Sequence, residues 1–321
     1  MQEFELINNF FLKLASKNKA SLNLNDDVYF DKNKGLVISV DSYNEGVHFV
    51  DFKQPHQVIK KVIRSSISDL VCKGVRPKYY FISGAGNKKH FSKKNLIDIS
   101  ESLSEEQKKY GILLCGGDTT FSTKLNFSIT VLGFSNKIIY RNKANLNDDI
   151  YVTGNLGDSF IGLEILKKKI KVNKKDQKYF VNRFYGPDVQ IKLTEKLLKF
   201  SNTSIDISDG LFSDLEKLIN RQKLRYQLYV DDIPISKKLS SLIKKRKIPK
   251  IKVVSNGDDY QILFTAQKKR SNMIKRISNK LGIKITKIGK ILPYNKKSLI
   301  IDEKGNDLRP KFKGYIHQFW T

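Results

Sequence analysis

Hydrophobic residues recur with two different periods along the chain, and this alternation predicts a mixture of helices and strands. Spacings of three and four residues predict helices over residues 57–72, 93–110, 189–200, 211–219 and 271–281, with a further helix that ends at residue 166. Short apolar or alternating runs predict strands over residues 35–40, 78–82, 111–115, 125–134, 150–153, 204–207, 226–230, 252–254, 261–265, 284–291 and 298–301. The N-terminal segment also has helical spacing, with an apolar face made of Phe4, Ile7, Phe10, Phe11 and Leu14.

Helices and strands are interspersed in both halves of the chain. This order favours an α+β fold with mixed sheets over one doubly wound sheet. A length of 321 residues favours two domains, and a polar connector lies near residues 142–147. We therefore expect an N-terminal domain over residues 1–140 and a C-terminal domain over residues 141–321.

Aspartates mark the ends of several predicted strands and the neighbourhood of several glycines. Burying an unpaired carboxylate is costly, whereas Mg²⁺ prefers oxygen ligands and shares its coordination shell with substrate phosphates. The aspartates therefore predict a metal-dependent enzyme that acts on phosphorylated molecules. The recurring positions are Asp26-Asp27, Asp41, Asp69, Asp118, Asp148-Asp149, Asp206, Asp209 and Asp258-Asp259.

The segment Gly116-Gly117-Asp118 follows a predicted strand. Paired glycines let backbone N–H groups approach an anion closely, and Asp118 would then hold the metal that bridges the phosphates. The alternative is an ordinary hairpin with a glycine turn. A GxxxxGK[ST] phosphate loop occurs nowhere in the sequence.

Four other carboxylates have a chemical and a structural interpretation. Asp206 lies inside an apolar strand and needs a partner, while Asp209 is either a ligand or the N-cap of the next helix. Asp69 interrupts the apolar face of helix 57–72, and Asp41 follows strand 35–40. The position of Asp41 suits a metal ligand, and Asp69 needs a ligand or a basic partner.

Two further motifs remain open between binding and turn formation. His48 either contacts a phosphate or caps a turn. Asn256–Asp259 has the composition of a tight turn, which is the simpler interpretation of that segment taken alone.

Charge and composition exclude several classes of protein. The net charge is +28, but only ten of the 60 basic residues are arginine and the lysines are spread along the chain, so we do not expect nucleic acid as a partner. No apolar run approaches the roughly 18–20 residues that a membrane helix needs, and the N-terminus lacks the order of a signal peptide. Cys72 and Cys115 have no metal-binding spacing and are expected to be reduced and buried in a cytoplasmic protein.

In their order along the chain, eight strings resemble the thiamine-monophosphate kinase family, and together they cover most of the sequence. They are NDD at 25–27, SVDSYNEGVHF at 39–49, SDLVCKGVRP at 68–77, GGDTT at 116–120, YVTGNLGDS at 151–159, DISDGLFSDL at 206–215, NGDDYQILF at 256–264 and KGY at 313–315.

The resemblance implies a two-domain fold like that of aminoimidazole ribonucleotide synthetase, with N-terminal domains that pair in a homodimer. It also implies ATP as co-substrate, Mg²⁺ as cofactor, and direct transfer of a phosphoryl group to thiamine monophosphate to give the diphosphate. The alternative is another ATP-dependent synthetase of the same superfamily, such as a selenophosphate synthetase or an aminoimidazole ribonucleotide synthetase. No cysteine precedes Asp26, and this absence counts against a selenophosphate synthetase.

The resemblance also implies roles for individual residues. Asp118 and Asp209 would be catalytic, and Val40 would serve the metal only through its backbone. The implied metal ligands are Asp27, Ser39, Val40, Asp41, Asp69, Asp118, Asp206 and Asp209. The implied ATP contacts are Tyr110, Gly116, Gly117, Arg141 and Ser208, and the implied contacts to thiamine phosphate are His48, Asp258 and Phe312.

Departures from the family pattern bear on substrate affinity more than on reaction type, and two of them are changes at single motifs. Asn23-Leu24-Asn25 replaces the usual Gly-x-Gly before the first aspartate pair, and asparagine tolerates a left-handed backbone better than most residues. Asp258 replaces a glutamate and is one methylene shorter.

Overall fold

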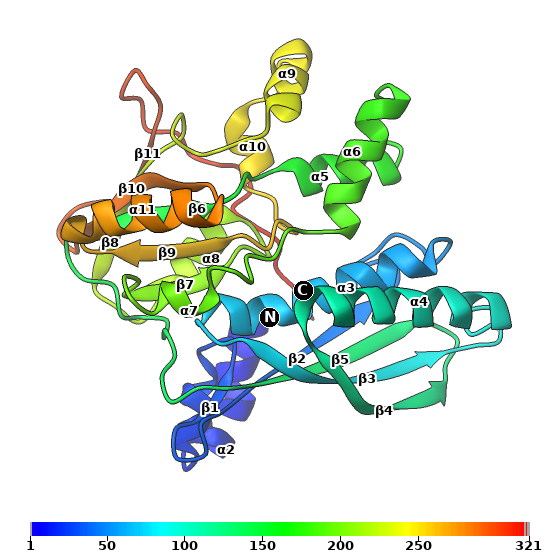
Figure 1. Cartoon of the computed structure of the whole chain (residues 1–321). Helices are drawn as coiled ribbons and strands as arrows, with labels where there is room; N and C mark the ends of the chain where they lie inside the picture. The colour runs from blue at the N-terminus through cyan, green and yellow to red at the C-terminus, as the bar shows by residue number, and fades with distance from the viewer. Residues whose placement is uncertain (1, 318, 320–321) are drawn as a thin grey trace.

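The computed structural model describes residues 2–317 and 319 and contains two mixed β-sheets with helices packed against them (Figure 1). The first sheet has the strand order β1-β2-β5-β3-β4, in which only β3 and β4 are parallel. Its strands are β1 Tyr29–Asp31, β2 Leu36–Asn44, β3 Pro77–Gly86, β4 Leu113–Phe121 and β5 Asn126–Phe134.

The second sheet has the order β11-β8-β10-β6-β9-β7, in which only β11 and β8 are parallel. Its strands are β6 Asp149–Thr153, β7 Thr203–Asp206, β8 Leu224–Tyr229, β9 Ile262–Ala266, β10 Ile285–Pro293 and β11 Leu299–Ile301. Both sheets mix parallel and antiparallel pairs, so the predicted two-domain α+β fold is confirmed.

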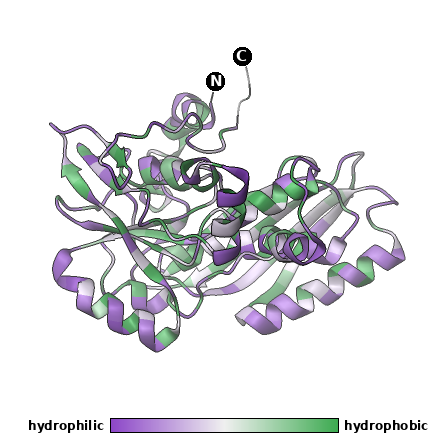
Figure 2. Ribbon diagram, turned by 90° about the horizontal axis from the view of Figure 1, so that it is seen from above, coloured by the Kyte–Doolittle hydropathy of each residue, from purple (hydrophilic) through white to green (hydrophobic). Residues whose placement is uncertain are grey.

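The outer helices are amphipathic and cover the sheets with their apolar sides. Figure 2 shows hydrophilic and hydrophobic residues alternating along these helices. The α-helices are α1 Glu3–Leu6, α2 Leu12–Ala15, α3 Pro55–Cys72, α4 Lys93–Tyr110, α5 Asp158–Leu166, α6 Lys174–Tyr185, α7 Thr194–Leu197, α8 Leu211–Leu218, α9 Lys237–Arg246, α10 Lys250–Val254 and α11 Ser271–Leu281. In the described part of the chain, no helix is both long and apolar enough to span a bilayer.

Helix α3 joins the two halves of the molecule. Proline at its first turn and Gly74 just past its end, at φ +78°, define its limits. Most of its side chains are buried, because it packs on β2 and β5 of the first sheet and on β7, α6 and α7 of the second half. One hydrophobic core therefore contains residues from both halves, for example Ile67 and Phe264.

Strand β4 forms one edge of the first sheet, and all nine of its residues are exposed. It carries Gly116-Gly117-Asp118 inside the strand, whereas the sequence placed this motif in a loop after residue 115. Cys115 is therefore exposed, contrary to expectation, while Cys72 is buried in α3 as expected. A Cβ atom on Gly117 would lie 1.7 Å from the carbonyl oxygen of Ile82, so the glycine is required by the close approach of β3 and β4.

Most of the predicted helices and strands are confirmed, and the main exceptions are one short apolar run and one predicted helix. Helices 93–110 and 271–281 are confirmed as α4 and α11. The predicted strand 252–254 is wrong, because these residues form α10; a run of this length cannot distinguish a strand from a helical turn. Of the predicted helix 189–200, only α7 is α-helical, and helices α6 and α9 were not predicted.

The N-terminal apolar face does not enter the core. Residues 3–15 form α1, a π-helical turn and α2, and Phe10, Phe11 and Leu14 are exposed. Phe4 and Ile7 instead line a cleft between the two halves.

Candidate active site

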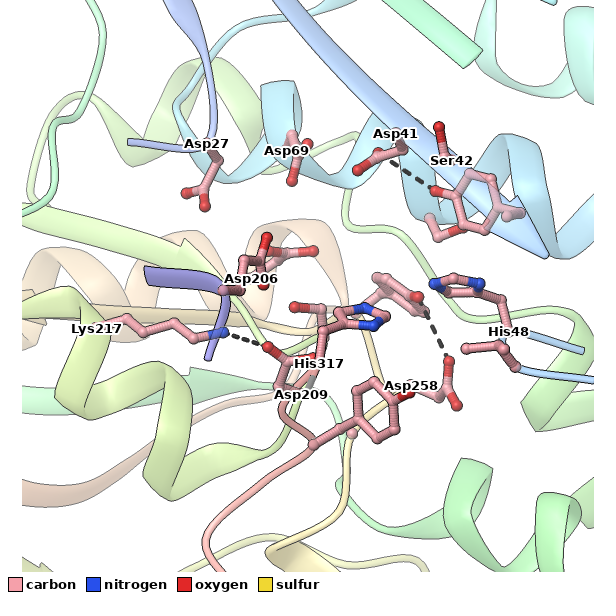
Figure 3. A pocket seen from close by; sticks show the side chains of 18 of the residues that line it. Asp27, Asp41, Ser42, His48, Asp69, Asp206, Asp209, Lys217, Asp258 and His317 are labelled. Carbon is pink, nitrogen blue, oxygen red and sulfur yellow. Dashed lines mark hydrogen bonds and ion pairs between the residues drawn. The ribbon is translucent and has the colours of Figure 1, made fainter. Parts of the chain in front are cut away.

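A cleft with a volume of about 490 Å³ lies between the two halves and is lined by residues from both (Figure 3). One wall comes from β2, α3 and the loop before β1, and the other from β7, α8, the loop before β9 and the C-terminal segment. The cleft-lining residues for which the sequence suggested roles are Asp27, Val40, Asp41, His48, Asp69, Arg141, Asp206, Ser208, Asp209, Asp258 and Phe312.

Three aspartates in the cleft have no basic partner in the described part of the chain. Asp41 lies on β2 next to the exposed Val40, Asp69 lies in the last turn of α3, and Asp206 ends β7. None of the three forms an ion pair, and Asp41 accepts only a 3.3 Å hydrogen bond from the hydroxyl of Tyr43. Figure 3 shows them directed into one space, and we call Asp41, Asp69 and Asp206 the open acidic set.

The open acidic set is poorly suited to full ionisation without a cation. Burial raises the pKa of Asp41 to about 7 and that of Asp206 to about 6. Burial, and then the charges of Asp41 and Asp206, raise the pKa of Asp69 well above its usual value. Bound Mg²⁺ would favour the ionised form of all three carboxylates, so the donor set fits a hard divalent cation.

The carboxylates surround the cleft without converging on one point. Among residues 2–317 and 319, no three His, Cys, Asp or Glu side chains lie close enough together to hold one metal ion. Mg²⁺ commonly binds through one or two carboxylates and completes its shell with water and phosphate oxygens. The arrangement therefore fits a cation that enters together with a phosphorylated substrate.

A second acidic pair, Asp26 and Asp27, already has basic partners. The Lys73 ammonium lies 2.7 Å from one oxygen of each aspartate, and the Arg141 guanidinium pairs with Asp27. Arg141 also donates its backbone N–H to Asp26 at 2.9 Å. Burial is the largest effect on Lys73 and would lower its pKa, but the acidic neighbours, Asp26 first among them, together raise the pKa, so the side chain remains cationic.

The loop before Asp26 adopts the conformation for which glycine would be expected. Leu22, Asn23 and Leu24 have φ values of +53°, +56° and +49°. Asparagine therefore occupies a left-handed position at Asn23, as the sequence suggested, and the adjoining leucines share this conformation.

His48 is held in one tautomer. Its Nδ1 accepts a 2.9 Å hydrogen bond from the backbone N–H of Asn44, so the proton of the neutral ring lies on Nε2. Burial, and then the neighbouring His317, lower the pKa of His48 to about 4. His48 is thus a neutral hydrogen-bond donor near pH 7.

The second wall is held together by backbone contacts between three segments. The N–H of Asp258 donates to the carbonyl of Ser208 at 2.8 Å, and the N–H of Tyr315 donates to the carbonyl of Asp209 at 3.0 Å. A Cβ atom on Gly314 would lie 2.4 Å from the Cβ of Ser213, which explains the glycine of the KGY string. These contacts place Phe312, Tyr315 and His317 in the cleft.

Besides Lys73, two further lysines that the sequence did not single out pair with site carboxylates. Lys217 on α8 pairs with Asp209, and also with Asp214 at 3.1 Å. Lys61 on α3 is 1% exposed, pairs with Asp258 and lies 3.7 Å from the ring centroid of Phe184. Lys61 lies on the buried face of α3 with Val58 and Val62. Val58 and Val62 are four positions apart and Lys61 lies between them, so the helical period placed Lys61 on the apolar face.

Five residues with suggested roles do not line the cleft of their own chain. The hydroxyl of Ser39 donates into the core, to the carbonyl of Ser66, and Tyr110 is buried beside Arg64 at the end of α4. Gly116, Gly117 and Asp118 lie on the exposed edge strand β4, three strands away from β2.

The fold and the cleft define an enzyme related to aminoimidazole ribonucleotide synthetase, and residues 20–135 match the family described as "AIR synthase related protein, N-terminal domain". The chain is 32% identical over 321 residues to thiamine-monophosphate kinase of Buchnera aphidicola subsp. Acyrthosiphon pisum, covering 94% of this chain and 97% of that protein. It is 31% identical to the Haemophilus influenzae enzyme of the same name, covering 97% and 93%. The chain thus belongs to the thiamine-monophosphate kinase family, as its sequence strings predicted.

A solved structure supports the same assignment. The structure described as "AaThiL complexed with AMPPCP and TMP" has a TM-score of 0.85 and 27% sequence identity. The match covers 99% of this chain and 97% of that one, so the likeness includes both sheets.

Proposed function

We propose that this chain transfers the γ-phosphoryl group of ATP to the phosphate of thiamine monophosphate, with Mg²⁺, to give thiamine diphosphate and ADP. The observation that carries the proposal is the open acidic set in a cleft whose fold matches a kinase solved with an ATP analogue and TMP. Asp41, Asp69 and Asp206, with Asp209 beside them, would hold the cation. When bound, Mg²⁺ neutralises charge on the phosphates.

The chain needs no strong general base for this reaction. The nucleophile is an oxygen of the substrate phosphate, which is already anionic near neutral pH. A bond forms between that oxygen and the γ-phosphorus, and the bond to the β-phosphate oxygen breaks, so that ADP leaves with the electron pair. The protein contributes position and charge.

Each wall of the cleft contributes side chains that position the substrates for phosphoryl transfer. The Nε2–H of His48 donates to the acceptor phosphate, while Arg141, Lys217 and the Ser208 hydroxyl face the nucleotide. Asp258 faces the cationic thiazolium ring of the substrate, and Phe312 packs against the heterocycle.

We further propose that two copies pair through the first sheet and complete each other's clefts. Edge strand β4 exposes the apolar side chains of Leu113, Leu114 and Phe121, and an unpaired apolar edge favours association. The residues Gly116-Gly117-Asp118 do not line the cleft of their own chain. Pairing along this edge would bring them from one copy to the cleft of the other copy. Tyr110 would contribute from the adjoining end of α4. The reduced cysteines fit a cytoplasmic setting that supplies ATP.

The purified full-length chain tests the proposed reaction. Incubated with ATP, Mg²⁺ and thiamine monophosphate, it should form thiamine diphosphate and ADP in equal amounts, measured by anion-exchange chromatography. Controls omit the acceptor, replace it with thiamine, or add EDTA. ADP formation with a ribonucleotide or selenide acceptor, and none with thiamine monophosphate, would overturn the proposal in favour of a synthetase.

Stability should depend on pH and Mg²⁺ together. The raised pKa values of Asp41 and Asp206, about 7 and about 6, favour the protonated folded state. This stabilisation is complete below the ordinary carboxyl pKa and is lost as the pH rises through 6 to 7. We expect Mg²⁺ to raise the melting temperature much more at about pH 8 than at about pH 5, since ionised carboxylates bind the cation.

The measurement is thermal unfolding with and without Mg²⁺ across this pH range. Asp206→Asn is the matched comparison. In this variant, the rise in melting temperature caused by Mg²⁺ should differ less between the two pH values. An Mg²⁺ effect that does not change with pH in the unmutated chain would contradict the assignment of these carboxylates.

A further inference from the structure

The two acidic groups of the cleft differ in how their charge is balanced. The open acidic set has no ion pair in the part of the chain that the structure describes, whereas Asp26 and Asp27 face Lys73 and Arg141. Two negative charges at this end therefore meet two positive charges from the protein itself. A divalent cation has much less to gain at Asp26 and Asp27 than at the open acidic set.

The side chain of Lys73 is held rigidly beside Asp26 and Asp27. Its side chain is fully buried at 0% exposure, and its ammonium contacts Asp26, Asp27 and the carbonyl of Ser204 at 2.7, 2.7 and 2.9 Å. An ammonium has three N–H donors, and here each has an acceptor. Lys73 also caps the C-terminal end of α3, where the helix dipole favours a cation.

The contacts of Lys73 connect three elements that form the cleft. Lys73 caps α3 and follows Asp69 by four positions, and it bridges the two carboxylates of the loop before β1. Its third acceptor, Ser204, belongs to β7, which ends at Asp206. A metal ion that bridges two carboxylates occupies the same kind of position between them. The ammonium thus fills the space in which such an ion would lie.

We propose that Lys73 is a resident cation that takes the place of one divalent ion at the Asp26–Asp27 end of the cleft, so that divalent ions bind at the open acidic set and not at that end. The inference rests on the proposed function for the presence of a metal site. It differs from the role that the family resemblance gave Asp27, because in this chain the carboxylate of Asp27 serves Lys73 and Arg141.

The test counts bound Mn²⁺ per chain by EPR titration, with and without AMPPCP. Lys73→Met keeps an apolar stem and removes the charge. We expect this variant to bind one more Mn²⁺ per chain than the unmutated protein. Without metal its melting temperature should fall by about 5 °C or more, because two largely buried carboxylates lose a partner, and Mn²⁺ should restore most of the loss. An unchanged Mn²⁺ count would overturn the proposal.

Lys61→Met is the matched control, since it also removes a buried lysine that pairs with an aspartate. It should lose stability that Mn²⁺ does not restore, and its Mn²⁺ count should stay that of the unmutated chain. Recovery by Mn²⁺ in this control as well would mean that the effect is not specific to Lys73, and would overturn the proposal.

A second pair of variants applies if Lys73→Met does not fold. Asp27→Asn should keep the Mn²⁺ count of the unmutated chain, whereas Asp206→Asn should bind one ion fewer. Loss of an ion in Asp27→Asn would overturn the proposal. Failure of the unmutated chain to form thiamine diphosphate would overturn the proposed reaction, but it would leave these ion counts as a separate result.

Discussion

Asp118→Asn and Asp206→Asn should each abolish formation of thiamine diphosphate, and dimers that combine the two inactive chains should recover activity. The recovery follows from the position of Asp118 on the exposed edge strand β4, away from the cleft of its own chain. In a mixed dimer, one cleft has its own Asp206 and receives an intact Asp118 from the other copy. Random pairing makes half the dimers mixed, with one working cleft of two, so the rate should be about a quarter of normal.

The measurement is the rate of product formation after co-expression and mixing of the two variants. Each variant alone should fall by roughly a thousandfold or more, because a carboxylate that positions charge in phosphoryl transfer has been removed. Asp118→Asn should keep its melting temperature to within about 1–2 °C, since an exposed side chain contributes little to stability.

Two outcomes would contradict this account. Full activity of Asp118→Asn would remove Asp118 from the mechanism. Absence of recovery in mixed dimers, with both variants inactive, would mean that one copy does not complete the cleft of the other.

Gly257→Ala should destabilise the chain more than any exposed substitution. A Cβ atom at this position would lie 1.8 Å from the carbonyl oxygen of Ser208, and backbone cannot move aside as a flexible side chain does. The same segment is fixed to residues 207–209 through the N–H groups of Asp258 and Tyr260, each at 2.8 Å from its acceptor. We expect a loss of roughly 3 kcal/mol or more in the free energy of unfolding.

Gly282→Ala is the control for this variant, measured by urea unfolding under the same conditions. Gly282 ends α11 at φ +64° with open space around its Cβ position, so the substitution should cost about 1 kcal/mol from backbone strain alone. Equal losses in the two variants would show that the contact between Gly257 and Ser208 is not the limiting constraint.

The sequence predicted elements well where local signals and the fold agree. The helix over residues 93–110 has Ser92 as its N-cap and Gly111 in a left-handed conformation at its end, and both limits were found from sequence. Residues 252–254 contain two adjacent valines, and only their burial against α5 selects a helical turn over a strand. Tertiary packing therefore determines the secondary structure of residues 252–254.

The same distinction applies to the site. A carboxylate in an apolar segment is visible in the sequence, and this signal identified Asp69 and Asp206, which both line the cleft. The partner of a lysine is not visible, because Lys73 meets aspartates that precede it by 46 and 47 positions. The sequence also did not show that Asp118 belongs to a sheet edge rather than to the cleft, since that position depends on how β4 pairs with β3.

The placement of α3 between both sheets has a consequence for folding. Because its side chains belong to one core shared by the two halves, neither half can unfold without exposing apolar surface of the other. The chain should therefore melt in a single cooperative transition, and a fragment limited to residues 1–140 would present an uncovered helix face prone to aggregation.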